Sequence, residues 1–134
     1  MSTNETKKYF DLHTQGIGYL NRIREVTPRV GTPFLSVTIA ALRGSVDNAQ
    51  YTHFECRVSG KQAQELVRKL KPAVEDSAKV LIGFTLSDLY AESFTFKSGD
   101  KAGETGISLK ARLLRIAWAK VDGQPFYTAQ EDAA

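Results

Sequence analysis

One helical pattern lies between segments that alternate apolar and polar residues, and this order limits the folds open to the chain. Residues 34–42 and 51–59 alternate in this way, which is typical of strands buried on one face. Residues 9–23 are apolar but interrupted by glycines, so we expect a bent strand rather than a helix. Prolines and a glycine predict a turn at residues 25–33. Three strands therefore precede the helix.

The helical pattern follows the third strand. Ser59 and Gln62 have the spacing of a capping box at its start. Pro72 is expected to end or kink the helix near Leu70. The apolar residues between these signals recur at helical spacing, at Ala63, Leu66, Val67 and Leu70.

Further β segments follow the helix. Residues 79–86 alternate, and residues 90–96 continue this strand or form one arm of a hairpin. Residues 97–106 hold three glycines and are predicted to form a hairpin loop. Residues 107–121 form the last long strand, and a turn signal follows at residues 122–123.

Five strands with one helix between the third and the fourth is the order of the OB-fold, a small Greek-key barrel. We therefore predict a mainly β chain, with a five-stranded OB-fold barrel over residues 9–128. An open α+β sheet with the same elements is the alternative, because both folds bury one face of each strand. Residues 1–8 are predicted to form a disordered tail, and residues 129–134 a short C-terminal tail.

Positive charge is concentrated in the body of the chain. Residues 7–127 carry all 18 lysines and arginines but 12 of the 15 acids. Residues 16–43 hold four arginines against one glutamate, and residues 107–120 hold four cations against no acid. Such concentration favours an anionic partner, of which nucleic acid is the commonest, although a solvated basic surface explains it equally well.

Motifs of catalysis and cofactor binding do not occur in the sequence. The glycines lack the spacing of a phosphate-binding loop or a dinucleotide fingerprint, and no nucleophile elbow is present. Cys56, the only cysteine, lies on the apolar side of its strand and is expected in the core. We therefore expect no enzyme, no cofactor and no metal site. The chain shows no signal peptide and no apolar run of about 18 residues, so a cytoplasmic protein without membrane contact is expected.

Rings and cations share the predicted outward strand faces. Binding of single strands needs cations along the phosphates and flat rings that stack on bases. Phe34 suits either stacking on a base or capping of the barrel end, and Tyr51 suits either stacking or half-buried packing at a strand start. The candidate binding residues are Tyr19, Arg22, Arg24, Phe34, Tyr51, His53, Arg57, Tyr90, Lys110 and Arg112.

Four segments resemble bacterial single-stranded DNA-binding proteins. They are Gly18-Tyr19-Leu20 followed by Glu25-Val26-Thr27-Pro28, the second strand at 34–40, the block Tyr51-Thr52-His53-Phe54-Glu55-Cys56-Arg57-Val58-Ser59-Gly60-Lys61, and residues 79–86. The whole chain more closely resembles a family of small replication proteins encoded on integrative and conjugative elements. That match runs from residues 8–12 through Gly16-Ile17-Gly18-Tyr19-Leu20-Asn21 to the third-strand block.

These resemblances imply an OB-fold, a single-stranded DNA ligand and a homo-oligomer, either a dimer or a tetramer. They also imply base stacking near His53 and Tyr90. Ser59 stands where an aromatic residue is usual, and residues 130–134 lack the acidic, apolar tip that recruits other enzymes. We therefore expect a single-stranded DNA-binding protein that serves replication or transfer of a mobile genetic element. The alternative is an OB-fold module that binds replication proteins and has lost DNA binding.

Overall fold

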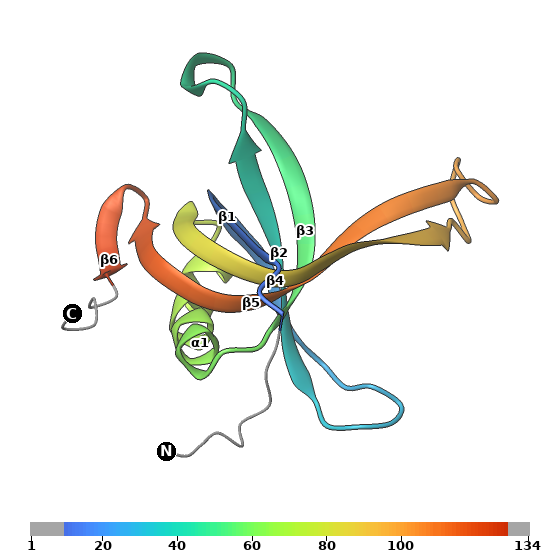
Figure 1. The fold of residues 1–134 in the computed structure, drawn as a ribbon, viewed down its shortest axis with the longest axis horizontal. Coiled ribbons are helices and arrows are strands. Elements are labelled where there is room, and N and C mark those ends of the chain that lie inside the picture. The colour runs from blue at the N-terminus through green and yellow to red at the C-terminus, as the bar shows by residue number, and fades with distance from the viewer. Residues whose placement is uncertain (1–9, 129–134) are drawn as a thin grey trace.

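The computed structural model describes residues 10–128, and the predicted tails at 1–8 and 129–134 lie outside this range. Over these described residues the fold is mainly β, with six strands and one α-helix between the third and fourth strands (Figure 1). In chain order the elements are β1 (His13–Val26), β2 (Phe34–Arg43), a 3-10 turn η1 (Val46–Asn48), β3 (Gln50–Val58), α1 (Lys61–Glu75), β4 (Val80–Thr95), β5 (Thr105–Val121) and β6 (Gln124–Thr128).

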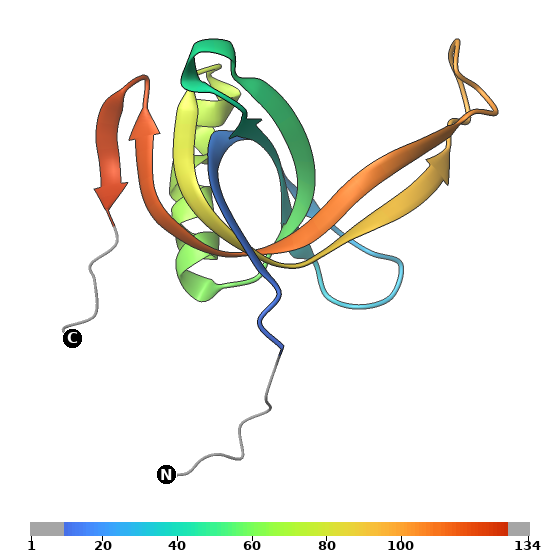
Figure 2. The ribbon, with the colours of Figure 1, turned by 45° about the horizontal axis from the view of Figure 1, so that its top comes forward.

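Five strands form a closed ring of pairings. The sheet order is β3-β2-β1-β4-β5-β6, and β3 also pairs with β5. The β3–β5 pairing is parallel, with Cys56 opposite Ala111, whereas the other pairings are antiparallel. Figure 2 looks into this ring, with α1 beside it. The mainly β class and the position of the helix are therefore confirmed, and β6 is an additional strand.

The core lies inside the ring and under α1. The β2 residues that alternation predicted to face inward, Leu35, Val37, Ile39 and Ala41, are all buried. The predicted inward side of β3 is buried at Phe54, Cys56 and Val58, and the four predicted helix residues are buried as well. Leu20 from β1, Ile82 from β4 and Leu113 from β5 complete the interior as fully buried side chains.

The predicted capping box is wrong, and the helix does not end at Pro72. The N-cap is Gly60, which has no side chain to cap the helix, and Gln62 instead bonds the backbone of Ile116 and the hydroxyl of Tyr127. The helix also continues past Pro72 to Glu75. Proline removes one helical hydrogen bond, while Ala73 and Val74 beyond it pack against the core. Packing of this last turn therefore outweighs the local preference.

β4 and β5 extend beyond the ring as a two-stranded arm, seen at the right of Figure 1. The segment at residues 90–96, predicted to continue the strand at 79–86 or to form a hairpin arm, does continue it: β4 runs from Val80 to Thr95 as one strand, with a bulge between Ser87 and Tyr90. Asp88 in this bulge has a φ of 58°, and its N–H donates to the carbonyl of Leu12 at 3.1 Å. Among residues 10–128, no helix is both long and apolar enough to cross a membrane.

Candidate nucleic-acid interface

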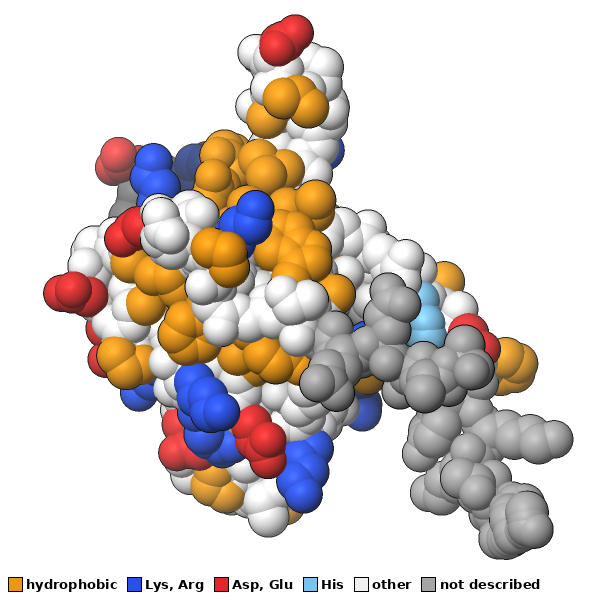
Figure 3. Space-filling view, turned by 90° about the vertical axis from the view of Figure 1, so that its left-hand side faces the viewer, with side chains coloured by type: hydrophobic (Ala, Val, Ile, Leu, Met, Phe, Trp, Pro, Cys, Tyr) orange, Lys and Arg blue, Asp and Glu red, His pale blue; other side chains and the backbone are white. Residues whose placement is uncertain are grey.

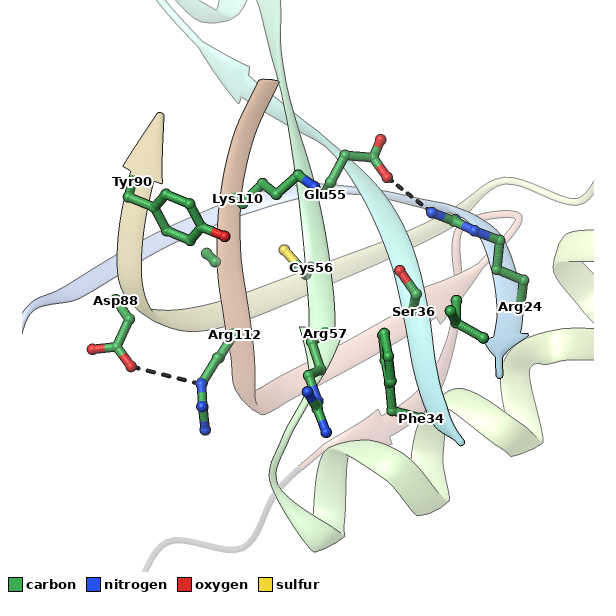
Figure 4. A pocket seen from close by; sticks show the side chains of 12 residues that line it. Arg24, Phe34, Ser36, Glu55, Cys56, Arg57, Asp88, Tyr90, Lys110 and Arg112 are labelled. Atoms are coloured by element: carbon green, nitrogen blue, oxygen red, sulfur yellow. Dashed lines mark hydrogen bonds and ion pairs between the residues drawn. The ribbon is translucent and has the colours of Figure 1, made fainter. Parts of the chain in front are cut away.

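An open cleft of about 580 Å³ lies where the outer faces of β2 and β3 meet the base of the arm (Figure 4). It contains six of the ten predicted binding residues. The lining comes from five strands and consists of Arg24, Val26, Phe34, Ser36, Glu55, Cys56, Arg57, Asp88, Tyr90, Lys110, Ala111 and Arg112. Aromatic rings and cations separated along the sequence therefore meet in one place.

One wall of the cleft is built by β2 and β3. Arg57 points outward because alternation buries its neighbours Cys56 and Val58. Its guanidinium carbon lies 4.3 Å from the centroid of the Phe34 ring, a cation–π contact. Bases stack on both aromatic rings and guanidinium planes, so this pair offers a flat surface at the end of the cleft.

The opposite wall is built by β4 and β5. Tyr90 lies opposite Lys110 across the ladder, and its side chain is exposed. Ser87 lies opposite Arg112, so the two residues of the bulge, Asp88 and Leu89, fall between these pairs. The bulge thereby places the Asp88 carboxylate beside Arg112 at the mouth of the cleft.

Three cations of the cleft are held by acids. Arg24 Nη2 donates to Glu55 Oε1 at 3.2 Å, and Thr38 Oγ1 donates to the second oxygen of that carboxylate at 2.9 Å. Lys110 Nζ lies 2.8 Å from Glu92 Oε1, and Arg112 Nε lies 3.7 Å from Asp88 Oδ2. The hydrogen bond to Glu92 raises the pKa of Lys110, so this amine stays charged across the physiological range.

The acids of these pairs were missing from the sequence-based site. The stretch 107–120 contains no acid, yet the ladder brings Asp88 and Glu92 of β4 beside it. Glu55 belongs to the predicted outward side of β3, between His53 and Arg57, so alternation alone was a signal for its place. The two β4 acids had no such signal, because the bulge sets their register.

Four predicted residues lie outside the cleft. Tyr19 and Tyr51 pack together with ring centroids 6.3 Å apart, and both line a second hollow of about 430 Å³ near the end of α1. Arg22 lies in a bulge of β1 with a φ of 50°, where its carbonyl accepts a hydrogen bond from Arg24. His53 is exposed on β3, opposite Ala40. None of these four residues lines the cleft.

Cys56 lies at the floor of the cleft with its thiol buried. Burial, with a smaller contribution from the charge of Glu55, raises its pKa to about 12. A thiol is nucleophilic only as the thiolate, so Cys56 acts here as a small apolar side chain. Among the described residues, no group of three histidine, cysteine or acidic side chains is placed to hold a metal ion.

Comparison with known proteins gives a family but no characterised relative. Neither the curated proteins nor the solved structures contain a match to this chain. Residues 3–134 match the family DUF3577, which is described as a protein of unknown function. The match spans nearly the whole chain, and the chain therefore belongs to this family.

Proposed function

We propose that the chain is an OB-fold protein that binds single-stranded DNA without sequence specificity. The observation that carries this proposal is the cleft, in which two aromatic side chains, Phe34 and Tyr90, lie among four cations. Rings that accept any base and cations that contact phosphates are the two requirements for sequence-independent binding of single strands. In this proposal the protein uses no cofactor and catalyses no reaction.

The strand connectivity supports the OB-fold part of the proposal. The ring runs β1-β2-β3-β5-β4, and α1 lies between β3 and β4 in the chain. OB-folds bind oligonucleotides on the face of their second and third strands and on the loops that join strands one to two and four to five. The cleft lies on this face, beside the arm that ends in the β4–β5 loop.

The biological setting is part of the proposal and rests on sequence. Residues 8–12 and 16–21 resemble small replication proteins of integrative and conjugative elements. We therefore propose that the protein serves replication or transfer of such an element, as a homo-oligomer in the cytoplasm that also contacts replication proteins.

A second candidate function is a module that binds replication proteins without binding DNA. One observation favours it: Arg24, Lys110 and Arg112 are already paired with carboxylates. Paired cations bind phosphate less readily than free ones, and aromatic residues serve protein interfaces as well as bases.

Fluorescence anisotropy with a labelled oligo-dT of about 15 nucleotides separates the two functions. We expect binding that weakens steeply between about 50 mM and about 200 mM salt, with a slope of about −0.7 per neutralised phosphate. Arg57→Ala should weaken binding and flatten the slope by about one contact. Arg115→Ala is the matched control, because it removes the same charge from β5 outside the cleft.

DNA binding is overturned if the added protein leaves the anisotropy of the labelled oligo-dT unchanged at low salt. Equal losses in Arg57→Ala and Arg115→Ala would show that net charge, rather than the cleft, determines the affinity.

A further inference from the structure

Two carboxylates of β4 lie directly on two cations of the cleft. Glu92 contacts Lys110 at 2.8 Å and Asp88 contacts Arg112 at 3.7 Å. All four side chains are between 41% and 61% exposed, so water and a ligand reach them freely. Arg57 differs, because within residues 10–128 it forms no ion pair and lies instead over the Phe34 ring.

We propose that Asp88 and Glu92 occupy the positions that two phosphates of a bound strand take, so that binding exchanges carboxylate for phosphate. This inference rests on the proposed function and explains how the site selects a nucleic-acid strand over small phosphate compounds. Carboxylates and phosphates accept the same charge-assisted hydrogen bonds from arginine and lysine. The carboxylates therefore mark the path of the DNA backbone along the base of the arm.

Exposed ion pairs are weak enough for this exchange. An exposed ion pair favours its paired state over its open state by a factor of about 1.5 to 5. A phosphate therefore displaces the carboxylate at little cost. A single phosphate gains one contact in this way. A strand gains several contacts in one association event, because its phosphates are covalently linked. The acids thus favour a polyanionic strand over small phosphate compounds.

The backbone at Asp88 makes the exchange testable without loss of the fold. Asparagine tolerates the left-handed conformation that Asp88 adopts at a φ of 58°. Asp88→Asn therefore keeps the bulge and removes the charge. Glu92→Gln likewise keeps the size of an exposed side chain in the arm.

We expect Asp88→Asn and Glu92→Gln each to bind labelled oligo-dT about 1.5- to 5-fold more tightly than the wild type at low salt. The salt slope should become steeper, because no freed carboxylate competes for the cation. Glu104→Gln is the matched control, since Glu104 lies at the end of the β4–β5 loop and forms no ion pair with another described residue. It should leave affinity within the error of the wild type.

A double-variant cycle tests whether the gain passes through the paired cation. In an Arg112→Ala background, Asp88→Asn should give no gain. Equal gains in Asp88→Asn, Glu92→Gln and Glu104→Gln would overturn the inference, because they would reflect net charge alone. Unchanged or weaker binding in the first two variants would overturn it too, while leaving DNA binding intact. If the wild type and every variant fail to bind, the proposed function itself fails, and the inference fails with it.

Discussion

Cys56 belongs to the core and is also one of the residues that line the cleft. Alternation along β3 was enough to predict the buried thiol. Burial raises its pKa to about 12, against an ordinary value of about 8.5. The folded state therefore keeps its proton at a pH where the unfolded state has lost it.

Cys56 should consequently resist iodoacetamide at pH 8 in the native protein and react once the protein is unfolded in urea. The raised pKa also means that its contribution to stability is complete below about pH 8.5 and is lost as pH rises toward 12. The free energy of unfolding, measured with urea at pH 8 and at pH 10, should therefore decrease less between these two pH values for Cys56→Ala than for the wild type. Rapid alkylation of the folded protein would contradict this placement.

Phe34 and Tyr51 differ in their surroundings, although sequence treats them alike. Phe34 lines the cleft beneath Arg57, whereas Tyr51 packs against Tyr19 in the second hollow. The face of each residue follows from alternation. The two groupings depend on which strands are neighbours, and sequence patterns alone do not reveal that.

Phe34→Ala should therefore weaken binding of oligo-dT by about 1–3 kcal/mol if one base stacks there. Tyr51→Ala should weaken binding of oligo-dT clearly less than Phe34→Ala. Phe54→Ala is the control for folding, because truncation of this buried ring should cost about 3–5 kcal/mol of stability. Anisotropy and thermal unfolding measure the two effects separately. A larger loss of affinity in Tyr51→Ala than in Phe34→Ala would place the binding surface at the second hollow instead.

At the scale of elements, sequence was most informative where a pattern is local. The strands and the buried stripe of α1 follow from periodicity, and residues 122–123 were recognised as a turn. Asp122 and Gly123 both have positive φ, as a tight hairpin requires. β6 was missed because it is short and contains Pro125, which a strand tolerates at the edge of a sheet.

Charge was least predictable at this scale. Residues 107–120 form an acid-free stretch, but in the folded chain each strand meets the charges of its neighbours. Lys110 lies directly opposite Tyr90 in the ladder, but the acid that contacts it is Glu92, two positions further along β4. The bulge at Asp88 sets the register that brings these β4 acids beside the cations of β5. A count of charges along β5 alone therefore overstated the unpaired positive charge of the cleft.

The end of α1 offers a stabilising substitution. Ser77 follows the C-cap residue Asp76 and has a φ of 66°, a conformation that glycine adopts without steric cost. Ser77→Gly should raise stability by about 0.5–1 kcal/mol. Ser77→Ala should not, since alanine keeps the steric cost. Thermal or urea unfolding checks both variants, and a decrease in stability for Ser77→Gly would contradict the assigned helix end.

At the scale of the whole molecule, one face carries apolar side chains away from the cleft. Figure 3 shows hydrophobic side chains gathered on the side that bears β6 and the end of β5. Phe126 of β6 is 48% exposed, and Trp118 of β5 lines a shallow hollow with Pro125. β6 pairs with β5 along one edge, and its other edge has no strand partner among the described residues. Exposed edges and apolar surface both favour association of copies.

We therefore expect light scattering at micromolar concentration to give a multiple of the 14.8 kDa chain mass. Phe126→Asp should shift the protein toward the monomer, because it places a charge on the apolar face beside the open edge of β6. Phe94→Asp is the matched control, since Phe94 is similarly exposed but lies on the arm. Neither exposed position should alter the core, so both variants should fold. A wild-type mass of 14.8 kDa would exclude association at that concentration, and an equal shift in both variants would place the contact on the arm as well.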